Sequence, residues 1–297
     1  MAIRKPKEDK VFDIINFIIL LILALIVLYP LYFIVIASIS DPDAVNGGDV
    51  TIYPIQPSLD GYARLFEDSS IWTGYRNTII YTVVGTLLSI IVTVSAGFAL
   101  SRKNLAGRNV LMAYFIITMY FGGGMIPLYI VINTLGLNNN PAVMVILGMV
   151  SVYNMIICRT FFQSNLPDEL FEAAEIDGCG VFQFYFRIAI PLSKAIIAVM
   201  VVFYAVGQWN SYFNAMMYLS NKEYYPLQLV LREILLQNRL TDVITSEGQL
   251  ADSLERQRYA ELIKYGVIVV SSVPVLIMYP FAQKYFVKGV MIGSVKG

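Results

Sequence analysis

The segment 165–191 combines five acidic residues with the signals that start and end a short helix. Pro167 suits the first turn of a helix, and Asp168 and Glu169 follow it where the helix dipole favours negative charge. Gly178 suits the position just beyond the last turn. We therefore expect a rod of about 16 Å. Its residue types favour recognition of another protein rather than the making or breaking of bonds.

One stripe of this expected helix is mostly small and apolar, and consists of Leu170, Ala173, Ala174 and Asp177. Alanines allow another backbone to come close, and Glu172 beside them offers a charge to a basic partner. The pattern predicts a helix that lies in a groove of another protein. The alternative is an amphipathic connector on the membrane surface, although five acids and no base between positions 168 and 186 suit an anionic leaflet poorly.

The stretch 172–191, EAAEIDGCGVFQFYFRIAIP, resembles the EAA loop of permease subunits of bacterial ABC importers. The residues that carry this resemblance are Glu172, Ala173, Ala174, Asp177, Gly178, Ile188 and Pro191. The stretches LPDELFEAAEIDG and FVKGVMIGSVKG resemble the carbohydrate-uptake permeases, in the branch related to lipoprotein-dependent oligosaccharide importers. Cys179 departs from the family pattern, in which Ala or Ser is more common.

The resemblance implies an all-α membrane protein with six transmembrane helices, a cytoplasmic EAA coupling-helix loop and the type I ABC importer permease fold. It also implies that the coupling helix docks in a cleft of a cytoplasmic ATPase, that Glu172 faces an arginine there, and that Gly178 forms the turn between two short helices. The implied partners are a second, different permease subunit, two cytoplasmic ATPase subunits that bind ATP and Mg, and an external solute-binding lipoprotein. The chain itself would hold no cofactor and no metal.

Polar and aromatic residues gather near the end of the apolar stretch 195–219, namely Trp209, Asn210, Ser211, Tyr212 and Asn214. On a continuous helix Asn210, Ser211 and Asn214 would share one face. Amides give directional hydrogen bonds to sugar hydroxyls and aromatic faces stack on sugar rings, so these residues are candidates for a solute pathway. The alternative is hydrogen bonding between helices. By resemblance, the partner permease can also hold the solute, and both alternatives stay open.

A second special segment holds Gly122, Gly123, Gly124 and Pro127. Glycine flexibility and the missing proline N–H both weaken a helix, so we expect a bend. The bend is a candidate hinge for alternating access. Close helix packing through the glycines is the alternative.

Several kinds of chemistry are excluded by residue type. Histidine is absent, which removes the usual general base and the commonest metal ligand. No Gly-x-x-x-x-Gly-Lys-Ser/Thr phosphate-binding loop occurs, so ATP must be hydrolysed by another subunit. Cys158 and Cys179 are too few and too far apart for a disulfide framework or a zinc site. No charged tail suggests nucleic acid, and no cluster of acids or metal ligands suggests a membrane enzyme.

The elements that carry these residues follow from composition, because 57% of the 297 residues are hydrophobic and only 14% are charged. A charged side chain at mid-bilayer costs about 2.5–3.5 kcal/mol, and a spanning helix needs about 20 residues. Uncharged stretches of that length or longer predict helices near 14–39, 77–100, 110–132, 141–162, 195–219 and 264–284. The first is longer than the core of a signal peptide, so we expect it to be retained. The turn-forming segment 133–141 makes a hairpin of the third and fourth.

The distribution of basic residues predicts the orientation. With the N-terminus inside the cell, the inner segments carry 13 basic and 8 acidic residues and the outer ones 8 and 13. We expect a cytoplasmic N-terminus (1–13), a permease domain (14–285) with external loops at 40–76 and 220–263, and a cytoplasmic tail (286–297). The loop 220–263 should hold a helix with Leu227, Leu231, Ile234 and Leu235 on one face.

Together these features predict a multi-pass permease subunit in a bacterial plasma membrane, embedded in lipid. It would form, with a second permease, a pathway for a sugar or oligosaccharide and work by alternating access. The alternative is a secondary transporter or channel subunit driven by an ion gradient, which would be favoured by carboxylates inside the apolar stretches, and none is present there. The sequence does not identify the solute.

Overall fold

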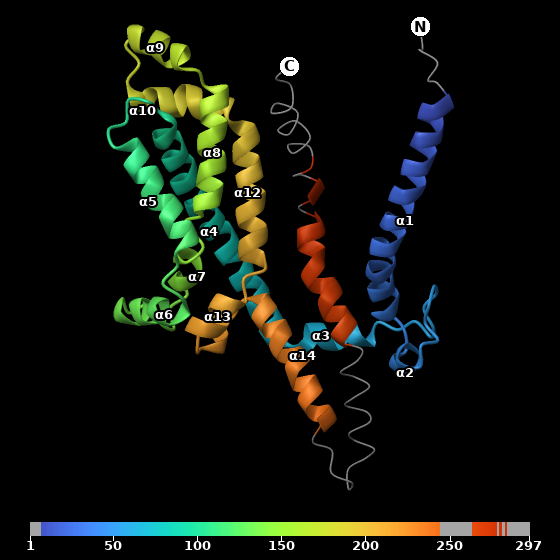
Figure 1. The fold of residues 1–297 in the computed structure, drawn as a ribbon. Coiled ribbons are helices and arrows are strands. Elements are labelled where there is room, and N and C mark those ends of the chain that lie inside the picture. The colour runs from blue at the N-terminus through green and yellow to red at the C-terminus, as the bar shows by residue number, and fades with distance from the viewer. Residues whose placement is uncertain (1–6, 244–262, 278, 281–282, 284–297) are drawn as a thin grey trace. The chain divides into compact units, whose positions relative to one another are not determined.

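The computed structural model describes residues 7–243, 263–277, 279–280 and 283. Every regular element in these residues is helical and none is a β-strand, which confirms the predicted all-α class. Ile263–Ile277 is helical as well. The other elements, most of which Figure 1 labels, are α1 (Lys7–Ala37), α2 (Pro42–Asn46), α3 (Asp60–Glu67), α4 (Ser69–Ser101), α5 (Arg108–Tyr120), α6 (Met125–Thr134), α7 (Ala142–Ile146), α8 (Val152–Asn165), α9 (Asp168–Ile176), α10 (Val181–Phe184), the π-helix η1 (Tyr185–Ala189), α11 (Ile190–Leu192), α12 (Lys194–Trp209), α13 (Phe213–Tyr218), the 3-10 helix η2 (Lys222–Tyr224) and α14 (Leu227–Val243).

Two described helices are long and apolar enough to cross a membrane alone, α4 and the part of α1 from Asp9 to Ala37. Two further pairs qualify as bent spans, α5 with α6 at 112° and Val181–Leu192 with α12 at 79°. The apolar helix Ile263–Ile277 is shorter, and the end of the predicted helix 264–284 lies outside the described residues.

The predicted helices 110–132, 141–162 and 195–219 are each divided in two. The first division falls at the expected bend, whereas the other two correct the prediction of continuous helices. The breaks fall at residues 121–124, 147–151 and 210–212, where glycine, serine and asparagine are common. These residues favour turns over helix interiors, and an average of hydropathy over a long window does not register the breaks at 147–151 and 210–212.

Small and hydroxyl residues line the buried face of α4, from Gly74 through Thr78, Gly85 and Ser89 to Gly97. Small side chains let helix backbones approach closely where lipid gives no hydrophobic force between helices. Accordingly α4 packs along both α8 and α12. Hydroxyls add cross-links, such as the 2.6 Å hydrogen bond between Thr93 Oγ1 and Tyr204 Oη of α12.

The unit formed by residues 69–232 has two distinct ends. In Figure 1, α9 and α10 lie at one end of α4, α8 and α12, and α13 lies at the other. At the α13 end Asn139 joins two loops: its backbone N–H donates to Tyr218 O at 2.7 Å, and its Oδ1 accepts from Ser220 N at 3.0 Å and Asn221 N at 2.9 Å.

The other unit contains α1, α2, α3 and the start of the helix at 263–277. Within it, Tyr62 Oη donates to Ser38 Oγ at 2.7 Å, and the rings of Phe33 and Tyr265 meet edge to face at 6.1 Å. The predicted helix in the loop 220–263 is confirmed as α14.

Candidate functional site

The segment predicted to be a docking element forms two short helices joined by a tight turn. Helix α9 begins at Asp168, directly after Pro167, whose ψ of 153° is extended. It ends at Ile176, and Gly178 follows with a φ of +77°, a left-handed conformation that glycine adopts without strain. The N–H of Cys179 donates to Ala174 O at 2.9 Å and closes the helix end.

The expected small-residue stripe of α9 is divided between the interior and the surface. Ala174 is buried and Leu170 half-buried, and both pack in a core cluster of this chain with Phe162 and Phe184. Ala173 and Asp177 are exposed. The expectation that all four residues form one face open to a partner is therefore wrong, since half of that face already fastens α9 to its own chain.

The two later motif residues lie on the second short helix and its continuation. Ile188 is half-buried against the same core cluster, whereas Pro191 is exposed in α11. Because Pro191 has no N–H, the usual helical bond to the carbonyl of Arg187 cannot form, and residues 185–189 adopt the π-helix η1 just before it.

The turn between α9 and α10 presents large apolar side chains to the outside. Ile176 is 86% exposed and Phe182 81% exposed, and Val181 and Phe186 are also exposed. Glu172 is exposed as well. Contiguous exposed apolar residues with a polar rim are typical of a protein interaction surface. We call Glu172, Ile176, Val181 and Phe182 the α9–α10 tip.

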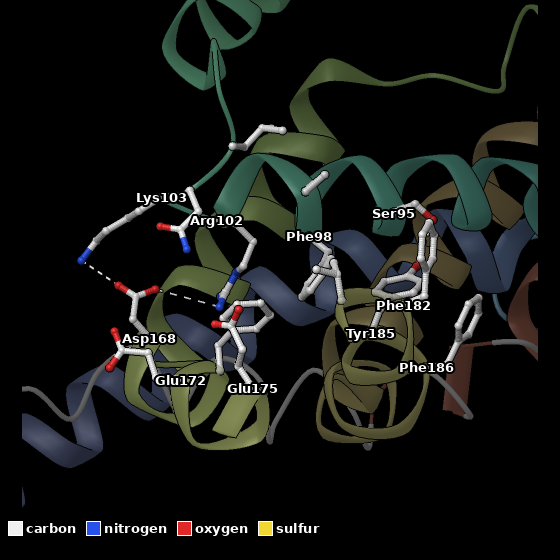
Figure 2. A pocket seen from close by; sticks show the side chains of 15 residues that line it. Ser95, Phe98, Arg102, Lys103, Asp168, Glu172, Glu175, Phe182, Tyr185 and Phe186 are labelled. Carbon is white, nitrogen blue, oxygen red and sulfur yellow. Dashed lines mark hydrogen bonds and ion pairs between the residues drawn. The ribbon is translucent and has the colours of Figure 1, made fainter. Parts of the chain in front are cut away.

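A cavity of about 800 Å³ lies beneath one side of α9 (Figure 2). Its apolar wall comes from aromatic rings of α4, α9, α10 and η1, namely Phe98, Phe171, Phe182, Tyr185 and Phe186. Three acids spaced i, i+4 and i+7 on α9, Asp168, Glu172 and Glu175, line it as well. Across the cavity, the hydroxyl oxygens of Ser95 and Tyr185 share a hydrogen bond of 2.9 Å.

Two basic residues from the end of α4 meet the start of α9. Lys103 Nζ lies 2.7 Å from Asp168 Oδ2, and Arg102 Nη1 lies 4.0 Å from Asp168 Oδ1. Thus the short basic segment 101–109 and the segment 165–191, expected on the same side of the membrane, are in contact. The hydrogen bond from Lys103 lowers the pKa of the Asp168 carboxyl and raises the pKa of the Lys103 ammonium.

Arg102 is a site residue that sequence reasoning missed. It is 9% exposed, and its Nη2 donates to Leu166 O at 3.1 Å. Burial lowers the pKa of its guanidinium, and the Asp168 carboxylate opposes that shift. From the sequence, Arg102 served only as one of the basic residues that predict the membrane orientation. Its contacts with Leu166 and Asp168 could not be predicted, because these residues are more than sixty positions away along the chain.

The solute-pathway candidates lie at the opposite end of α12 from α9 (Figure 1). Trp209 is the last residue of α12 and is buried. Asn210 Nδ2 donates to Val206 O at 2.9 Å and thereby closes that helix. Because the helix stops there, Asn210, Ser211 and Asn214 do not share a continuous helical face, which corrects that expectation. Tyr212 is exposed, and Ser211 and Asn214 are half-buried.

Gln208, next to these candidates, fills a narrow gap between two other segments. A Cβ on Gly85 of α4 would lie 2.7 Å from Gln208 Nε2, and one on Gly148 would lie 2.4 Å from it. The side chain of Gln208 is buried, and its Nε2 has no hydrogen-bond acceptor. A side chain at either position would therefore force the Gln208 side chain to move from this gap.

The glycine-rich candidates for a hinge coincide with the break between α5 and α6. Gly124 precedes α6 with a φ of +89° and a ψ of 177°, a conformation open essentially to glycine alone. Gly122 and Gly123 have room for a side chain, and Pro127 lies within the first turn of α6, where its missing N–H has no cost. The predicted bend is confirmed at 112°, and its use as a hinge stays a prediction.

Among the residues that the structure describes, no cluster of three or more His, Cys, Asp or Glu could hold a metal ion. Cys158 is buried and Cys179 half-buried, and both are free thiols. The arrangement thus has an exposed apolar tip with an acidic flank at one end of the helices and polar groups at the other.

Comparison with known proteins places the whole chain among transport proteins. It is 37% identical to LplC of Bacillus subtilis over 297 residues, which is 100% of this chain and 98% of that protein. It is also 37% identical to YtcP of Bacillus subtilis, a polygalacturonan/rhamnogalacturonan transport system permease protein, over 98% of this chain and 100% of that protein. The crystal structure of a bacterial ABC transporter involved in the import of the acidic polysaccharide alginate contains a similar chain, with a TM-score of 0.84 and 35% identity, covering 96% of this chain and 100% of that one.

The profile of one family, the binding-protein-dependent transport system inner membrane component, matches residues 85–292, which include the α9–α10 tip, the cavity and the candidate pathway. The all-α architecture and the full-length similarities agree with that match. The chain therefore belongs to this family of ABC importer permeases and has its type I fold.

Proposed function

We propose that this chain is a permease subunit of an ATP-driven importer of a sugar or oligosaccharide. It works with a second, different permease, two cytoplasmic ATPases and an external solute-binding lipoprotein in a bacterial plasma membrane. Both chain termini and the α9–α10 tip face the cytoplasm, and the loops at 40–76 and 220–263 face outward. The carbohydrate substrate is supported by the relatives, one of which is a polygalacturonan/rhamnogalacturonan transport permease.

The observation that carries the coupling role is the α9–α10 tip itself. It presents exposed Ile176 and Phe182 beside Glu172, and half of α9 is packed into the core that also contains Phe98 of α4. An apolar tip with an acidic flank suits a hydrophobic cleft with a basic rim on an ATPase. ATP-driven movement of that cleft would displace α9 and rock the spans between inward-facing and outward-facing states, with bending at Gly122–Gly124 as a candidate hinge. Because the chain has no phosphate-binding loop of its own, ATP and Mg are held by the ATPases.

The solute pathway is proposed to pass Asn210, Ser211, Tyr212 and Asn214, at the end of the spans away from the ATPase. Amide and hydroxyl groups would exchange hydrogen bonds with sugar hydroxyls, and the exposed ring of Tyr212 would stack on a sugar face. Trp209 is buried at the foot of this group and would support its position rather than contact solute.

Purification of the complex tests the function. The affinity-tagged wild-type chain, extracted in a mild detergent with its neighbouring subunits co-expressed, should bring down two ATPase subunits and a second permease. Glu172→Arg should lower ATPase recovery, because it places a like charge against the basic rim of the cleft. The exposed Glu169→Arg is the matched control, since Glu169 does not line the cavity and lies outside the tip.

A preparation that contains no ATPase, or one in which Glu172→Arg recovers the ATPases as wild type does, would contradict the docking role. Uptake into vesicles that responds to an ion gradient and ignores ATP would instead favour a secondary transporter.

A further inference from the structure

The side chain of Arg102 touches both α4 and α9. Its guanidinium carbon lies 5.4 Å from the ring centre of Phe98 in α4 and 5.8 Å from the ring centre of Phe171 in α9. Its Nη2 donates to the carbonyl of Leu166, which precedes α9, at 3.1 Å, and its Nε donates to Ser101 Oγ at 3.2 Å. One side chain therefore fastens the end of a long apolar helix to the start of the docking helix (Figure 2).

This contact depends on the shape of arginine as well as on its charge. A planar guanidinium can lie between two aromatic rings and donate hydrogen bonds from its edge at the same time, which a lysine ammonium cannot do. The Arg102 residue is only 9% exposed, and its Nη1 has no hydrogen-bond acceptor although Asp168 Oδ1 is 4.0 Å away. A cation buried with one donor unsatisfied is costly for stability alone, so its position needs another reason.

The cavity explains why a single side chain can matter here. The cavity of about 800 Å³ is lined by residues of α4, α9, α10 and η1. The cavity interrupts the apolar packing beside the rings of Phe98, Phe171 and Tyr185, and polar cross-links supplement that packing. These cross-links are Arg102 itself, the exposed ion pair of Lys103 with Asp168, and the hydrogen bond between Ser95 and Tyr185.

We propose that Arg102 is a positioning residue that makes α9 and the adjoining end of α4 move as one body, so that displacement of α9 by the ATPase is transmitted to the spans. The proposal rests on the proposed function, because it presumes that an ATPase moves α9. In this proposal Arg102 transmits movement, and it takes part in neither docking nor solute binding.

The test measures the distance between α9 and α4 in the purified complex with its ATPases. Nitroxide labels are attached to cysteines introduced at Glu169 of α9 and Leu87 of α4, both of which are exposed. Cys179 is changed to Ser so that it is not labelled, and Cys158 is kept because it is buried. Pulsed electron resonance gives the distance without nucleotide and with the ATPases trapped by ATP and vanadate. In the wild type the distance should be the same in both states.

Arg102→Met removes the charge and the donors but keeps an apolar chain between the rings. In this variant we expect a complex that still contains its ATPases and hydrolyses ATP, with a Glu169–Leu87 distance that shifts on trapping. Arg102→Lys keeps the charge, and its Glu169–Leu87 distance should shift in the same direction by a smaller amount. If the complex with Arg102→Met does not assemble, the Lys variant alone tests whether Arg102 holds α9 to α4. Lys103→Met is the matched control, because it removes a base from the same carboxylate without touching either ring, and its distance should not shift.

The outcomes are distinct for the two proposals. A wild-type preparation without ATPases overturns the proposed function and this inference with it. A complex that hydrolyses ATP while the distance stays fixed in both Arg102 variants overturns the inference alone. A wild-type distance that already shifts on trapping, or a Lys103→Met variant that shifts as Arg102→Met does, also overturns it.

Discussion

Two glycines that lie two positions apart in the segment proposed to dock differ in backbone conformation. Gly178 has a φ of +77° in the turn between α9 and α10, whereas Gly180 has a φ of −69°. Neither has a neighbouring atom within 4 Å of the place where a Cβ would be. Both positions therefore have room for a side chain, and they differ only in backbone conformation.

We therefore expect Gly178→Ala to strain the turn by about 1–2 kcal/mol, which corresponds to a roughly 5- to 30-fold change between two conformers. Transport per ATP hydrolysed should fall in the reconstituted complex, and Gly178→Pro should abolish it because proline fixes φ near about −65°. Gly180→Ala should behave as wild type. Equal activity of the Gly178→Ala and Gly180→Ala proteins would show that the turn does not need its left-handed residue.

The ion pair at the start of α9 predicts a response to pH. The folded pKa of the Asp168 carboxyl lies below its ordinary value of about 3.9, so its stabilising effect is complete above that value and is lost as pH falls through the lower folded pKa. The folded pKa of Lys103 lies above its ordinary value of about 10.4, so its effect is complete below that and is lost as pH rises through the higher one. The contact should hold throughout the range between.

A nitroxide at the exposed Ala173 reports the mobility of α9 in the purified chain. Its spectrum should stay unchanged from about pH 5 to about pH 9 and become more mobile below about pH 4. In Asp168→Asn the acid-induced change should be absent. A rise in mobility already between about pH 5 and about pH 7 in the wild type would mean that another group controls the contact.

At the scale of elements, close approach of α4 to its neighbours decides how the unit of residues 69–232 is packed. At Gly97 a Cβ would meet Cys158 Cβ of α8 at 2.7 Å and Arg159 N at 3.1 Å. Neither atom is the far end of a flexible side chain, so the two helices would have to separate. The Arg159 Nε bond to Leu100 O, 3.1 Å long, lies beside this contact and would be disturbed as well.

Gly97→Ala should therefore destabilise the purified chain by about 1–3 kcal/mol, the usual cost of overpacking. The measurement is the midpoint of thermal aggregation in detergent, followed by size exclusion. Gly207→Ala on α12 is the control, because nothing lies within 4 Å of its Cβ position and its midpoint should match wild type. A Gly97→Ala protein as stable as that control would show that α4 and α8 can slide apart at no cost.

At the scale of the whole molecule, the sequence predicts what depends on local composition and misses what depends on distant contacts. The helical class, the ends of α9 and the bend before Gly124 follow from apolar length, from Pro167 and Gly178 and from glycine content. The pairing of Arg102 with Asp168 does not follow from local composition, because residues so far apart in the chain leave no periodic signal.

The breaks at 147–151 and 210–212 were not predicted either, since a few polar residues hardly change the mean hydropathy of a long window. The fit of Gln208 against Gly85 and Gly148 was also missed, because it involves three separate segments of the chain.

At the scale of the whole molecule, the chemistry of the candidate pathway also bears on which solutes are transported. The candidate pathway residues themselves offer amides, hydroxyls and aromatic rings, and a base lies beside them, since the guanidinium carbon of Arg232 is 5.8 Å from the ring centre of Tyr212. The amides, hydroxyls and rings recognise groups that acidic and neutral sugars share, so under the proposed function we expect the proposed external lipoprotein to make most of the discrimination by charge.

We therefore expect oligogalacturonides, alginate oligosaccharides and neutral malto-oligosaccharides to be taken up by the reconstituted complex in the same rank order as they bind to the isolated lipoprotein. Calorimetry on the lipoprotein gives one order, and ATP-dependent uptake into proteoliposomes gives the other. Asn214→Leu should slow the uptake of every solute that is transported and leave the order unchanged, because it removes a general hydrogen-bond partner. Uptake that separates acidic from neutral sugars more sharply than the lipoprotein does would place charge selectivity inside the permease pair, where Arg232 of this chain or a base of the second permease would supply it.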